Sequence, residues 1–335
     1  MERPYLLFLG DVGDQLAAKT AHGIADWRPQ WCVGQLRLPG CKADTGLADL
    51  TLEEAAARGA KTLIVAVANS GGSMPEHWTD TIVRALDLGM DVASGLHVRL
   101  GRLPAVAAAA AKGGRKLFDV RYTDQTFNTG KGFKRSGMRC LTVGTDCSVG
   151  KKYTALAITK EMEKRGLKAD FRATGQTGIF ISERGVAIDA VISDFISGAA
   201  EWLTPENDPD HWDIVEGQGS LFHAAFAGVT LGLLHGAQPD ALVLCHEPTR
   251  KHMRGLPHAP IPDLKDCFQP YRSMATLTNP ECRFVGVSID THLLSPGAAE
   301  RLLKSVEDRF GLPCVDPLAT GTGPIVDALE KLCAS

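Results

Sequence analysis

The chain has 335 residues, of which 44% are hydrophobic and 22% are charged, and this balance excludes a disordered chain. The formal net charge of -3 gives no electrostatic support to a nucleic-acid partner. No apolar run approaches the roughly 20 residues that a membrane span needs, so we expect neither a nucleic-acid nor a membrane partner.

The first part of the chain alternates short apolar runs with helical patterns. Strands are predicted at residues 5–9, 31–36, 61–68, 91–96 and 116–120, and helices at 51–58, 76–88 and 104–112. Such alternation is typical of a parallel sheet with helices on both faces. We therefore expect an α/β fold that begins with a Rossmann-like domain over residues 1–137.

Residues 121–137 interrupt this alternation and form the predicted connection between two domains. The segment is polar and glycine-bearing, and it carries Lys131, Lys134 and Arg135. These cations indicate either a solvated linker or the rim of an anion-binding site.

A second α/β series occupies residues 138–335, the predicted C-terminal domain. Strands are expected at 138–143, 169–173, 211–215, 241–245, 283–289 and 313–315, and helices at 150–165, 296–310 and 323–332. Residues 247–275 contain five prolines and receive no regular assignment, so they are a candidate functional loop or lid.

The most informative stretch follows the first strand of the second series. The apolar run ends at Gly144, and Gly150-Lys151 then opens a long helical pattern. Strand, glycine-bearing turn, Gly-Lys and helix in this order indicate a phosphate-binding loop, although a tight turn with an exposed lysine is the alternative. The predicted cofactor-binding residues are Gly144, Thr145, Asp146, Cys147, Ser148, Val149, Gly150, Lys151 and Lys152.

Lys152 occupies the position at which phosphate-binding loops usually carry a Mg²⁺-binding Ser or Thr. The loop itself resembles that of dethiobiotin synthetase and its relatives, which read G-T-D-x-x-V-G-K-T. Val215-Glu216-Gly217-Gln218-Gly219 also resembles their V-E-G-A-G-G, whose glutamate helps to hold Mg²⁺. A second lysine in place of a metal ligand favours a metal-free, highly phosphorylated ligand such as coenzyme A.

Across nearly its full length the chain resembles the D-glutamate N-acetyltransferase family. The resemblance is carried by residues 144–154, 173–178, 191–201 and 216–220. It implies a two-domain α/β subunit, with a P-loop NTPase-like second domain, that transfers an acetyl group from acetyl-CoA to the amine of a D-amino acid, D-glutamate first among them. Acetyl-CoA would then be a co-substrate.

Acetyl transfer to an amine needs a general base and a group that aligns the substrate. The candidate catalytic residues are Asp44, Asp194 and Glu216, which follow apolar runs, although a turn, a helix N-cap and a surface turn are their respective structural alternatives. His97 is a weaker candidate base. The candidate substrate-binding residues are Asn69, Ser70, Gly71, Arg121 and Arg172, since arginine binds carboxylates in a bidentate manner.

Two other interpretations remain open. The chain would be an ATP-dependent ligase or kinase if Glu216 and Asp194 bind Mg²⁺, or a nucleotide-binding regulator without turnover. No spacing of ligands predicts a metal site otherwise. Cys147 is either a simple loop residue or an acetyl-accepting nucleophile.

Nine cysteines without a C-x-x-C pair are typical of a reducing compartment, so a cytoplasmic protein is expected. A homodimer is expected because it is the commonest assembly.

Overall fold

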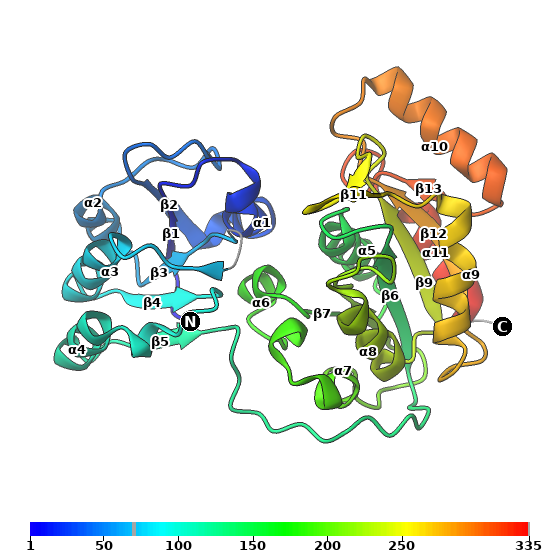
Figure 1. Cartoon of the computed structure of the whole chain (residues 1–335), viewed down its shortest axis with the longest axis horizontal. Helices are drawn as coiled ribbons and strands as arrows, with labels where there is room; N and C mark the ends of the chain where they lie inside the picture. Colours follow the sequence, from blue (N-terminus) through cyan, green and yellow to red (C-terminus); the bar gives the residue numbers. More distant parts are fainter. Residues whose placement is uncertain (69–71, 334–335) are drawn as a thin grey trace. The chain divides into compact units, whose positions relative to one another are not determined.

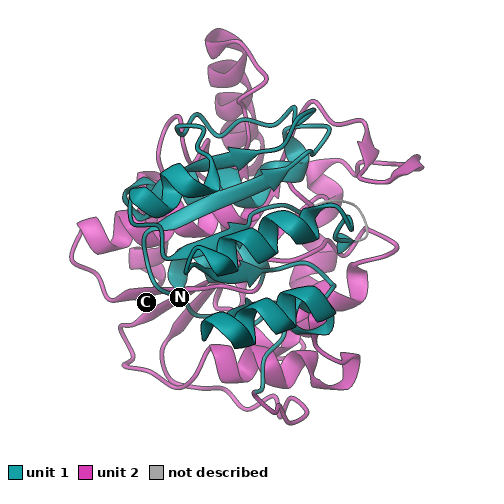
Figure 2. Cartoon of the chain, turned by 90° about the vertical axis from the view of Figure 1, so that its left-hand side faces the viewer, with its two compact units in different colours: residues 1–124, 175–187 teal, residues 125–174, 188–335 magenta. Residues whose placement is uncertain are grey.

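The computed structural model describes residues 1–68 and 72–333, which form two compact units (Figures 1 and 2). Unit 1 consists of residues 1–124 and 175–187, and unit 2 of residues 125–174 and 188–335. These units differ from the expected domains in two places. Residues 125–137 belong to unit 2, and residues 175–187 leave the second half of the chain to join unit 1.

Unit 1 is built on a five-stranded parallel sheet with the order β2-β1-β3-β4-β5. All six residues of β1 are buried, as expected for a strand covered on both faces. The order reverses between β1 and β3, which makes this the topological switch point of the sheet. The strands are β1 (Tyr5–Gly10), β2 (Cys32–Arg37), β3 (Thr62–Val65), β4 (Asp91–Ser94) and β5 (Leu117–Asp119).

The helices of unit 1 begin and end where the local sequence favours it. Thr51 forms a capping box with Glu54 at the start of α2, and Gly114 ends α4 in the left-handed conformation, with φ 60°. The elements are η1 (Leu16–Ala18), α1 (Lys19–Trp27), η2 (Pro29–Trp31), α2 (Leu52–Ala57), α3 (Trp78–Asp87), η4 (Leu100–Arg102) and α4 (Pro104–Gly113).

Helix α6 (Gln176–Ser182) is the segment that joins unit 1 from the second half of the chain. It buries Ile179, Phe180 and Ile181, and the Thr177 and Thr20 hydroxyl oxygens lie 3.0 Å apart. The sequence analysis assigned no helix to these residues, since seven residues with an internal glycine give little helical periodicity. Apolar contacts with the rest of unit 1 stabilise this helix, which the local sequence pattern does not predict.

Unit 2 contains a six-stranded parallel sheet with the order β13-β12-β9-β6-β8-β7. The fold class predicted from the sequence, two parallel α/β units, is therefore confirmed. The strands are β6 (Met138–Gly144), β7 (Ala169–Arg172), β8 (Trp212–Val215), β9 (Ala241–His246), β12 (Arg283–Ile289) and β13 (Cys314–Val315).

Two apolar clusters cover the faces of this sheet. Helices α5 (Lys151–Lys164) and α11 (Gly323–Cys333) pack in one cluster. Helices α7 (Ile196–Leu203), α8 (Ala227–Ala237), α9 (Leu264–Ala275) and α10 (Pro296–Phe310) contribute to the other (Figure 1). Two short turns, η5 (Ile188–Ala190) and η6 (Ser193–Phe195), precede α7. Covered on both sides, the sheet exposes its carboxyl edge to ligands.

The proline-bearing stretch 247–275 is more regular than expected. It forms an antiparallel hairpin of β10 (His252–Met253) and β11 (Leu256–Pro260), followed by α9. Asp263 caps α9 by accepting a hydrogen bond from the Lys265 backbone N–H. The helix continues through Pro270 because Leu264, Cys267, Tyr271 and Ala275 bury one face of it. Burial outweighs the cost of an internal proline.

Residues 125–134 are mostly exposed, whereas residues 135–137 are half-buried and held to unit 2 by arginines. The wholly buried Arg139 donates hydrogen bonds to the carbonyls of Ser136, Gly137 and Pro205. Arg135 donates to the Thr204 carbonyl at 2.8 Å. Lys134 forms an ion pair with Asp240. Lys134 and Arg135 thus have partners within unit 2, while most of residues 125–134 remains exposed to solvent.

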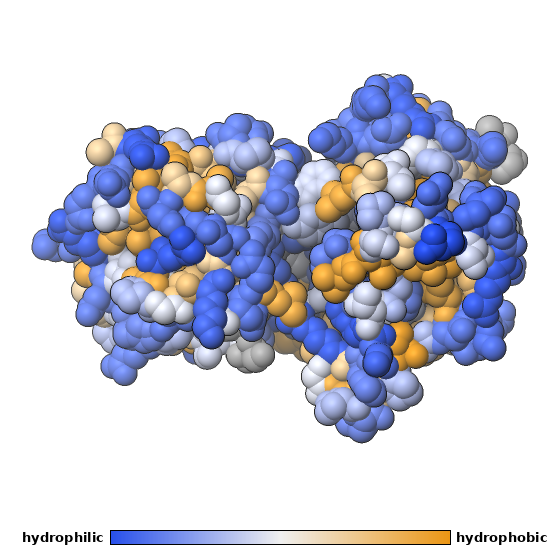
Figure 3. All heavy atoms as spheres, turned by 90° about the horizontal axis from the view of Figure 1, so that it is seen from above, coloured by the Kyte–Doolittle hydropathy of each residue, from blue (hydrophilic) through white to orange (hydrophobic). Residues whose placement is uncertain are grey.

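Hydrophilic side chains cover most of the face shown in Figure 3, with apolar ones visible between them. Among the described residues, no helix has both the length and the apolar character required to cross a membrane.

Candidate functional site

The predicted phosphate-binding loop connects β6, a central strand of the unit 2 sheet, to α5. Gly144 ends the strand, and a Cβ added there would lie 2.7 Å from Val149 Cγ2 and 3.1 Å from Lys151 Nζ. Gly150, the N-cap of α5, has φ 91°. The loop therefore needs glycine at both positions, once for close packing and once for backbone conformation.

The inner side of the loop presents unpaired hydrogen-bond donors. The backbone N–H groups of Ser148, Val149, Gly150 and Lys151 find no acceptor among the residues that the structure describes. Val149 and Lys151 are buried. Consecutive N–H groups at the start of a 14-residue helix attract an anion, because they lie at the positive end of the helix dipole.

Lys151 adds a cation that is largely withdrawn from solvent. Its side chain is buried, and its Nζ donates a hydrogen bond to the Asp146 carbonyl at 2.7 Å. Burial lowers the pKa of Lys151, because the charged form loses its hydration. Lys152 is partly exposed, with its Nζ 4.8 Å from the centre of the Tyr153 ring. A bound phosphate would stabilise both ammonium groups.

The end of β8 packs against the start of α5. The Gly217 N–H donates to Thr142 Oγ1 at 2.9 Å, and Thr142 Oγ1 donates to the Lys151 carbonyl at 3.1 Å. A Cβ added to Gly217 would overlap the Thr142 carbonyl oxygen. Glu216, buried beside it, accepts a hydrogen bond from the Thr174 N–H at 3.0 Å. The predicted site residues Glu216 and Lys151 are therefore brought to one edge of one sheet.

Tyr271 of α9 connects the loop to the turn that follows Gly219. Its hydroxyl donates to the Gly144 carbonyl at 2.7 Å and accepts from the Leu221 N–H at 3.2 Å. Burial raises the pKa of Tyr271 to about 12, so the hydroxyl remains a donor at neutral pH. This contact fixes the end of β6.

Two arginines that the sequence analysis did not identify hold the outer side of the loop. Arg250 donates to Asp146 Oδ2 at 2.8 Å, to the Cys147 carbonyl at 2.6 Å and to the Ser148 carbonyl at 2.9 Å. Arg254 donates its backbone N–H to Asp146 Oδ2 at 2.8 Å and its guanidinium to the Ser148 hydroxyl. Both belong to the segment around the β10–β11 hairpin, which the prolines had marked as a functional loop.

The carboxylates Asp44 and Asp194 are both exposed. Asp44 lies in unit 1, where its Oδ1 accepts hydrogen bonds from Gln35 Nε2 and the Gly46 N–H, each at 2.8 Å. The Gly46 N–H and then Gln35 hold the pKa of Asp44 below its usual range. Asp194 lies in unit 2 within the 3-10 turn η6, and it is not the N-cap of α7. Asp44 and the phosphate-binding loop thus belong to different units, whereas Asp194 and the loop belong to the same one.

The predicted substrate-binding residues fall in different units. Arg121 is buried in unit 1. Arg172 lies on β7 of unit 2, with its Nε 2.7 Å from Oδ1 of the buried Asp213. This hydrogen bond ties the guanidinium of Arg172 to the neighbouring strand β8. Asn69, Ser70 and Gly71 lie outside the described residues, and His97 is exposed in unit 1.

Possible metal ligands approach one another at two places in unit 2. Ligand atoms of Asp146, Cys147 and His223 lie within 4.8 Å of one another, and so do those of Asp170, His211 and Asp213. Arg250 already pairs with Asp146 at 2.8 Å, and Arg172 with Asp213 at 2.7 Å. Arg250 thus neutralises the carboxylate of the first group, whereas in the second group the two carboxylates Asp170 and Asp213 share the one guanidinium of Arg172.

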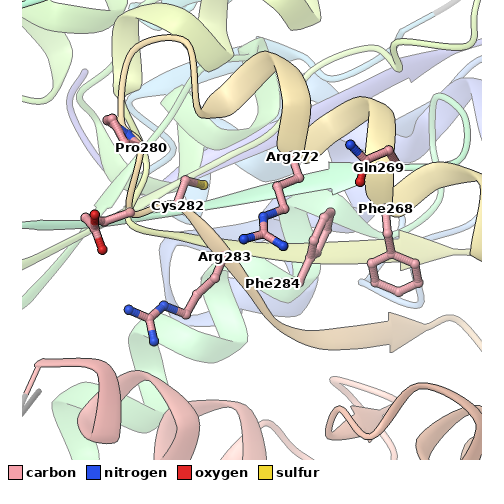
Figure 4. Close-up of a pocket in the computed structure, with 8 residues that line it drawn as sticks. Phe268, Gln269, Arg272, Pro280, Cys282, Arg283 and Phe284 are labelled. Atoms are coloured by element: carbon pink, nitrogen blue, oxygen red, sulfur yellow. The ribbon is translucent and has the colours of Figure 1, made fainter.

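A pocket of about 460 Å³ lies on unit 2 between α9 and the start of β12 (Figure 4). Phe268, Phe284, Arg272 and Arg283 contribute to its lining. It begins at the amino end of β12, whereas the phosphate-binding loop follows the carboxyl end of β6. None of the site residues predicted from the sequence lines this pocket.

Comparison with known families matches both halves of the chain. Residues 126–326 match the model described as "Domain of unknown function (DUF1611_C) P-loop domain", and residues 36–123 match "Domain of unknown function (DUF1611_N) Rossmann-like domain". The chain belongs to the DUF1611 family. This agrees with the phosphate-binding loop of unit 2 and with the parallel sheet of unit 1.

Two named relatives are similar over almost their full length. A D-glutamate N-acetyltransferase of Tritonibacter scottomollicae is 56% identical and covers 99% of this chain and 100% of its own length. A D-glutamate N-acetyltransferase of a Pseudoalteromonas species is 50% identical and covers 96% of this chain and 97% of its own length. The crystal structure of a DUF1611 family protein from Anabaena variabilis is 28% identical, with a TM-score of 0.89 over 98% of this chain and 100% of that one.

Proposed function

We propose that this protein is a D-glutamate N-acetyltransferase that uses acetyl-CoA as the acetyl donor. The observation that carries the proposal is the 56% and 50% identity, over nearly the whole chain, to two proteins of that name. Identity at this level over both units makes a shared reaction the simplest account, and the resemblance seen in the sequence alone favours the same family.

The donor would bind through its phosphates at the loop of unit 2. Four unpaired N–H groups, the buried Lys151 and the partly exposed Lys152 suit a ligand with several phosphate charges. A Ser or Thr that would hold Mg²⁺ is replaced by Lys152. Coenzyme A, which carries a pyrophosphate and a 3′-phosphate, matches this arrangement without a metal ion.

The acetyl group would then lie away from the loop, because the pantetheine arm separates the thioester from the phosphates. We therefore assign Glu216, which contacts the Thr174 N–H beside the loop, a positioning role instead of the role of general base. For the same reason Cys147, inside the loop, is unsuited to accept the acetyl group. Asp44 and Asp194 remain candidate bases, and Asn69, Ser70, Gly71, Arg121 and Arg172 candidate substrate ligands.

The experiment that tests this function measures release of the coenzyme A thiol. The purified protein is mixed with acetyl-CoA and either D-glutamate or L-glutamate, and the acetylated product is identified by mass spectrometry. We expect thiol release and N-acetylglutamate with the D-enantiomer. Equal hydrolysis of acetyl-CoA with and without amino acid, and no N-acetylated product, would refute the proposal.

The competing function is a Mg²⁺- and ATP-dependent ligase or kinase, favoured by the likeness of the loop to that of dethiobiotin synthetase. Lys152→Thr separates the two. If coenzyme A binds at the loop without a metal ion, this variant binds it about fivefold more weakly, because one charge contact of about 1 kcal/mol is lost. Lys164→Thr, at the exposed end of α5, is the control. Tight Mg²⁺–ATP binding by the unaltered protein, with no binding of coenzyme A, would favour the ligase.

We also propose that the protein acts in the cytoplasm as a homodimer. None of the nine cysteines forms a disulfide in the structure, which suits a reducing compartment, and two-fold symmetry is the commonest assembly of soluble proteins. Light scattering coupled to size-exclusion chromatography measures the mass in solution. A mass of one 35.8 kDa chain would contradict the dimer.

A further inference from the structure

Ser148 lies at the centre of the phosphate-binding loop in an unfavourable backbone conformation. Its φ is 52°, in the left-handed region that glycine adopts readily and other residues rarely do. A non-glycine residue held there is strained, and neighbouring contacts must offset that strain. The left-handed residue is also useful, since it turns successive N–H groups toward a common point where an anion binds.

The contacts that hold Ser148 come from Arg250 and Arg254. The Arg250 guanidinium bonds to the carbonyls on either side of the Ser148 Cα, those of Cys147 at 2.6 Å and Ser148 at 2.9 Å. Arg254 bonds to the Ser148 hydroxyl. Asp146, which is wholly buried, accepts from Arg250 and from the Arg254 N–H, each at 2.8 Å, and so keeps both arginines on the outer side of the loop.

These carbonyl contacts set the direction of the donors. In a trans peptide the C=O and the following N–H point in opposite directions. A guanidinium that binds the carbonyls of Cys147 and Ser148 therefore directs the N–H groups of Ser148 and Val149 away from itself. Those are two of the four N–H groups that find no acceptor among the described residues.

We propose that Arg250 is a positioning residue that preorganises the loop for phosphate by holding Ser148 in its left-handed conformation. The inference rests on the proposed function in so far as the ligand is a phosphate ester. Arg250 acts through the loop, not through contact with the ligand, so its effect on binding depends on the residue at position 148. An arginine that contacted the phosphate directly would act independently of that residue.

Isothermal titration of coenzyme A and of inorganic pyrophosphate tests this dependence. Arg250→Ala is expected to raise both dissociation constants about tenfold, the effect of losing hydrogen bonds worth about 1.4 kcal/mol. Ser148→Gly alone is expected to change them by less than about twofold, since glycine adopts the same φ at no steric cost. The double variant Ser148→Gly/Arg250→Ala should recover to within about threefold of the unaltered protein, because the strain that Arg250 opposes is gone.

Arg250→Lys and Arg301→Ala complete the set. Lysine cannot bind two carbonyls at once with a planar fork, so Arg250→Lys should remain weaker than the unaltered protein even though the charge is kept. Arg301 is exposed on α10, and its loss should change nothing. If the thermal transition shows that Arg250→Ala does not fold, the dissociation constants of Arg250→Lys and of the double variant Ser148→Gly/Arg250→Lys are compared instead.

The outcomes separate the two proposals. Equal weakening by Arg250→Ala in the parent protein and in the Ser148→Gly background would overturn the positioning role and favour direct contact. No weakening at all would overturn it as well. Binding of pyrophosphate without coenzyme A would refute the proposed donor while the comparison at position 250 still stands. Binding of neither ligand by the unaltered protein would refute both.

Discussion

The carboxyl edges of the two sheets differ in how their polar groups are satisfied. In unit 1, Asp11 Oδ1 accepts from Trp78 Nε1 at 2.8 Å, Asp44 Oδ1 accepts from Gln35 Nε2 at 2.8 Å, and Asp119 Oδ1 accepts from the Leu100 N–H at 2.9 Å. In unit 2, the loop after β6 carries N–H groups without acceptors and a buried lysine, among the residues that the structure describes.

The difference indicates where a ligand is required. Aspartates, glycines and small polar residues follow the strands of both sheets, so residue type does not distinguish the two edges. Unpaired buried donors are costly, and proteins retain them where a ligand completes the hydrogen bonds. By this criterion the loop of unit 2 is the stronger candidate for an anion site, although in unit 1 the buried Gln176 Oε1 beside Gly95 also has no partner among the described residues.

The largest expected effect is that of Gly217→Ala. The added Cβ would overlap the Thr142 carbonyl oxygen, so β6 and the 216–217 turn must separate. We expect a loss of about 3 kcal/mol in the free energy of unfolding, and no binding of coenzyme A. Urea denaturation and titration calorimetry measure the two effects. Gly228→Ala on α8, where a Cβ meets nothing within 4 Å, should leave both unchanged. Normal binding by Gly217→Ala would contradict the site geometry.

Lys151→Ala is expected to weaken coenzyme A binding by about 10- to 100-fold. The ammonium would form a charge-assisted hydrogen bond with phosphate, worth about 1.5–3 kcal/mol. Since burial lowers the pKa of Lys151 in the free protein, the unliganded variant should not be less stable than the parent at neutral pH. Calorimetry and thermal denaturation test both points, with Lys164→Ala as control. An unchanged affinity of Lys151→Ala for coenzyme A would show that the ligand does not bind at this loop.

Tyr271→Phe should lower the free energy of unfolding at pH 7 by about 2 kcal/mol, since buried groups of Gly144 and Leu221 lose their partner. Burial raises the Tyr271 pKa from 10.0 to about 12, so its stabilising effect is complete below pH 10 and is lost as the pH rises toward 12. Denaturation in urea at pH 7 and pH 11 should show the difference between the parent and the variant shrinking. A constant difference would contradict this, and Tyr122→Phe in unit 1 is the control.

Asp44→Asn is expected to have the smallest effect. The carboxylate is exposed and lies 3.4 Å from Arg37, and such pairs contribute about 0.2–1 kcal/mol. Because hydrogen bonds hold the pKa of Asp44 below its usual range, any stabilisation is present above about pH 4 and disappears as the pH falls through the folded-state pKa. Coenzyme A affinity should not change. A tenfold loss of affinity would show that the unit 1 edge takes part in donor binding.

The loop was predictable because its signal is local: a strand, Gly144, Gly150 and Lys151 lie within one short stretch. The contacts of Arg250 and Arg254 with the loop were not predictable. The two arginines lie about a hundred residues further along the chain, and the sequence around their hairpin shows neither helical nor strand periodicity. The pairing of Gly144 with Cys245 places that segment beside the loop, and only the sheet order reveals it. Helix α9 was not predicted because Pro270 lies inside it. Helix α6 was not predicted because it is stabilised by contacts with unit 1, which is formed mostly by the first part of the chain.

The N–H groups of the unit 2 loop are the inferred anion site, on which the assignment of the donor depends. Amide-resolved NMR of deuterated, ¹⁵N-labelled protein during titration with coenzyme A observes them directly. We expect the largest amide shifts at Ser148, Val149, Gly150 and Lys151, with no comparable change at residues 44–46 of unit 1. Saturable coenzyme A binding that leaves those four amides unshifted would contradict the assignment.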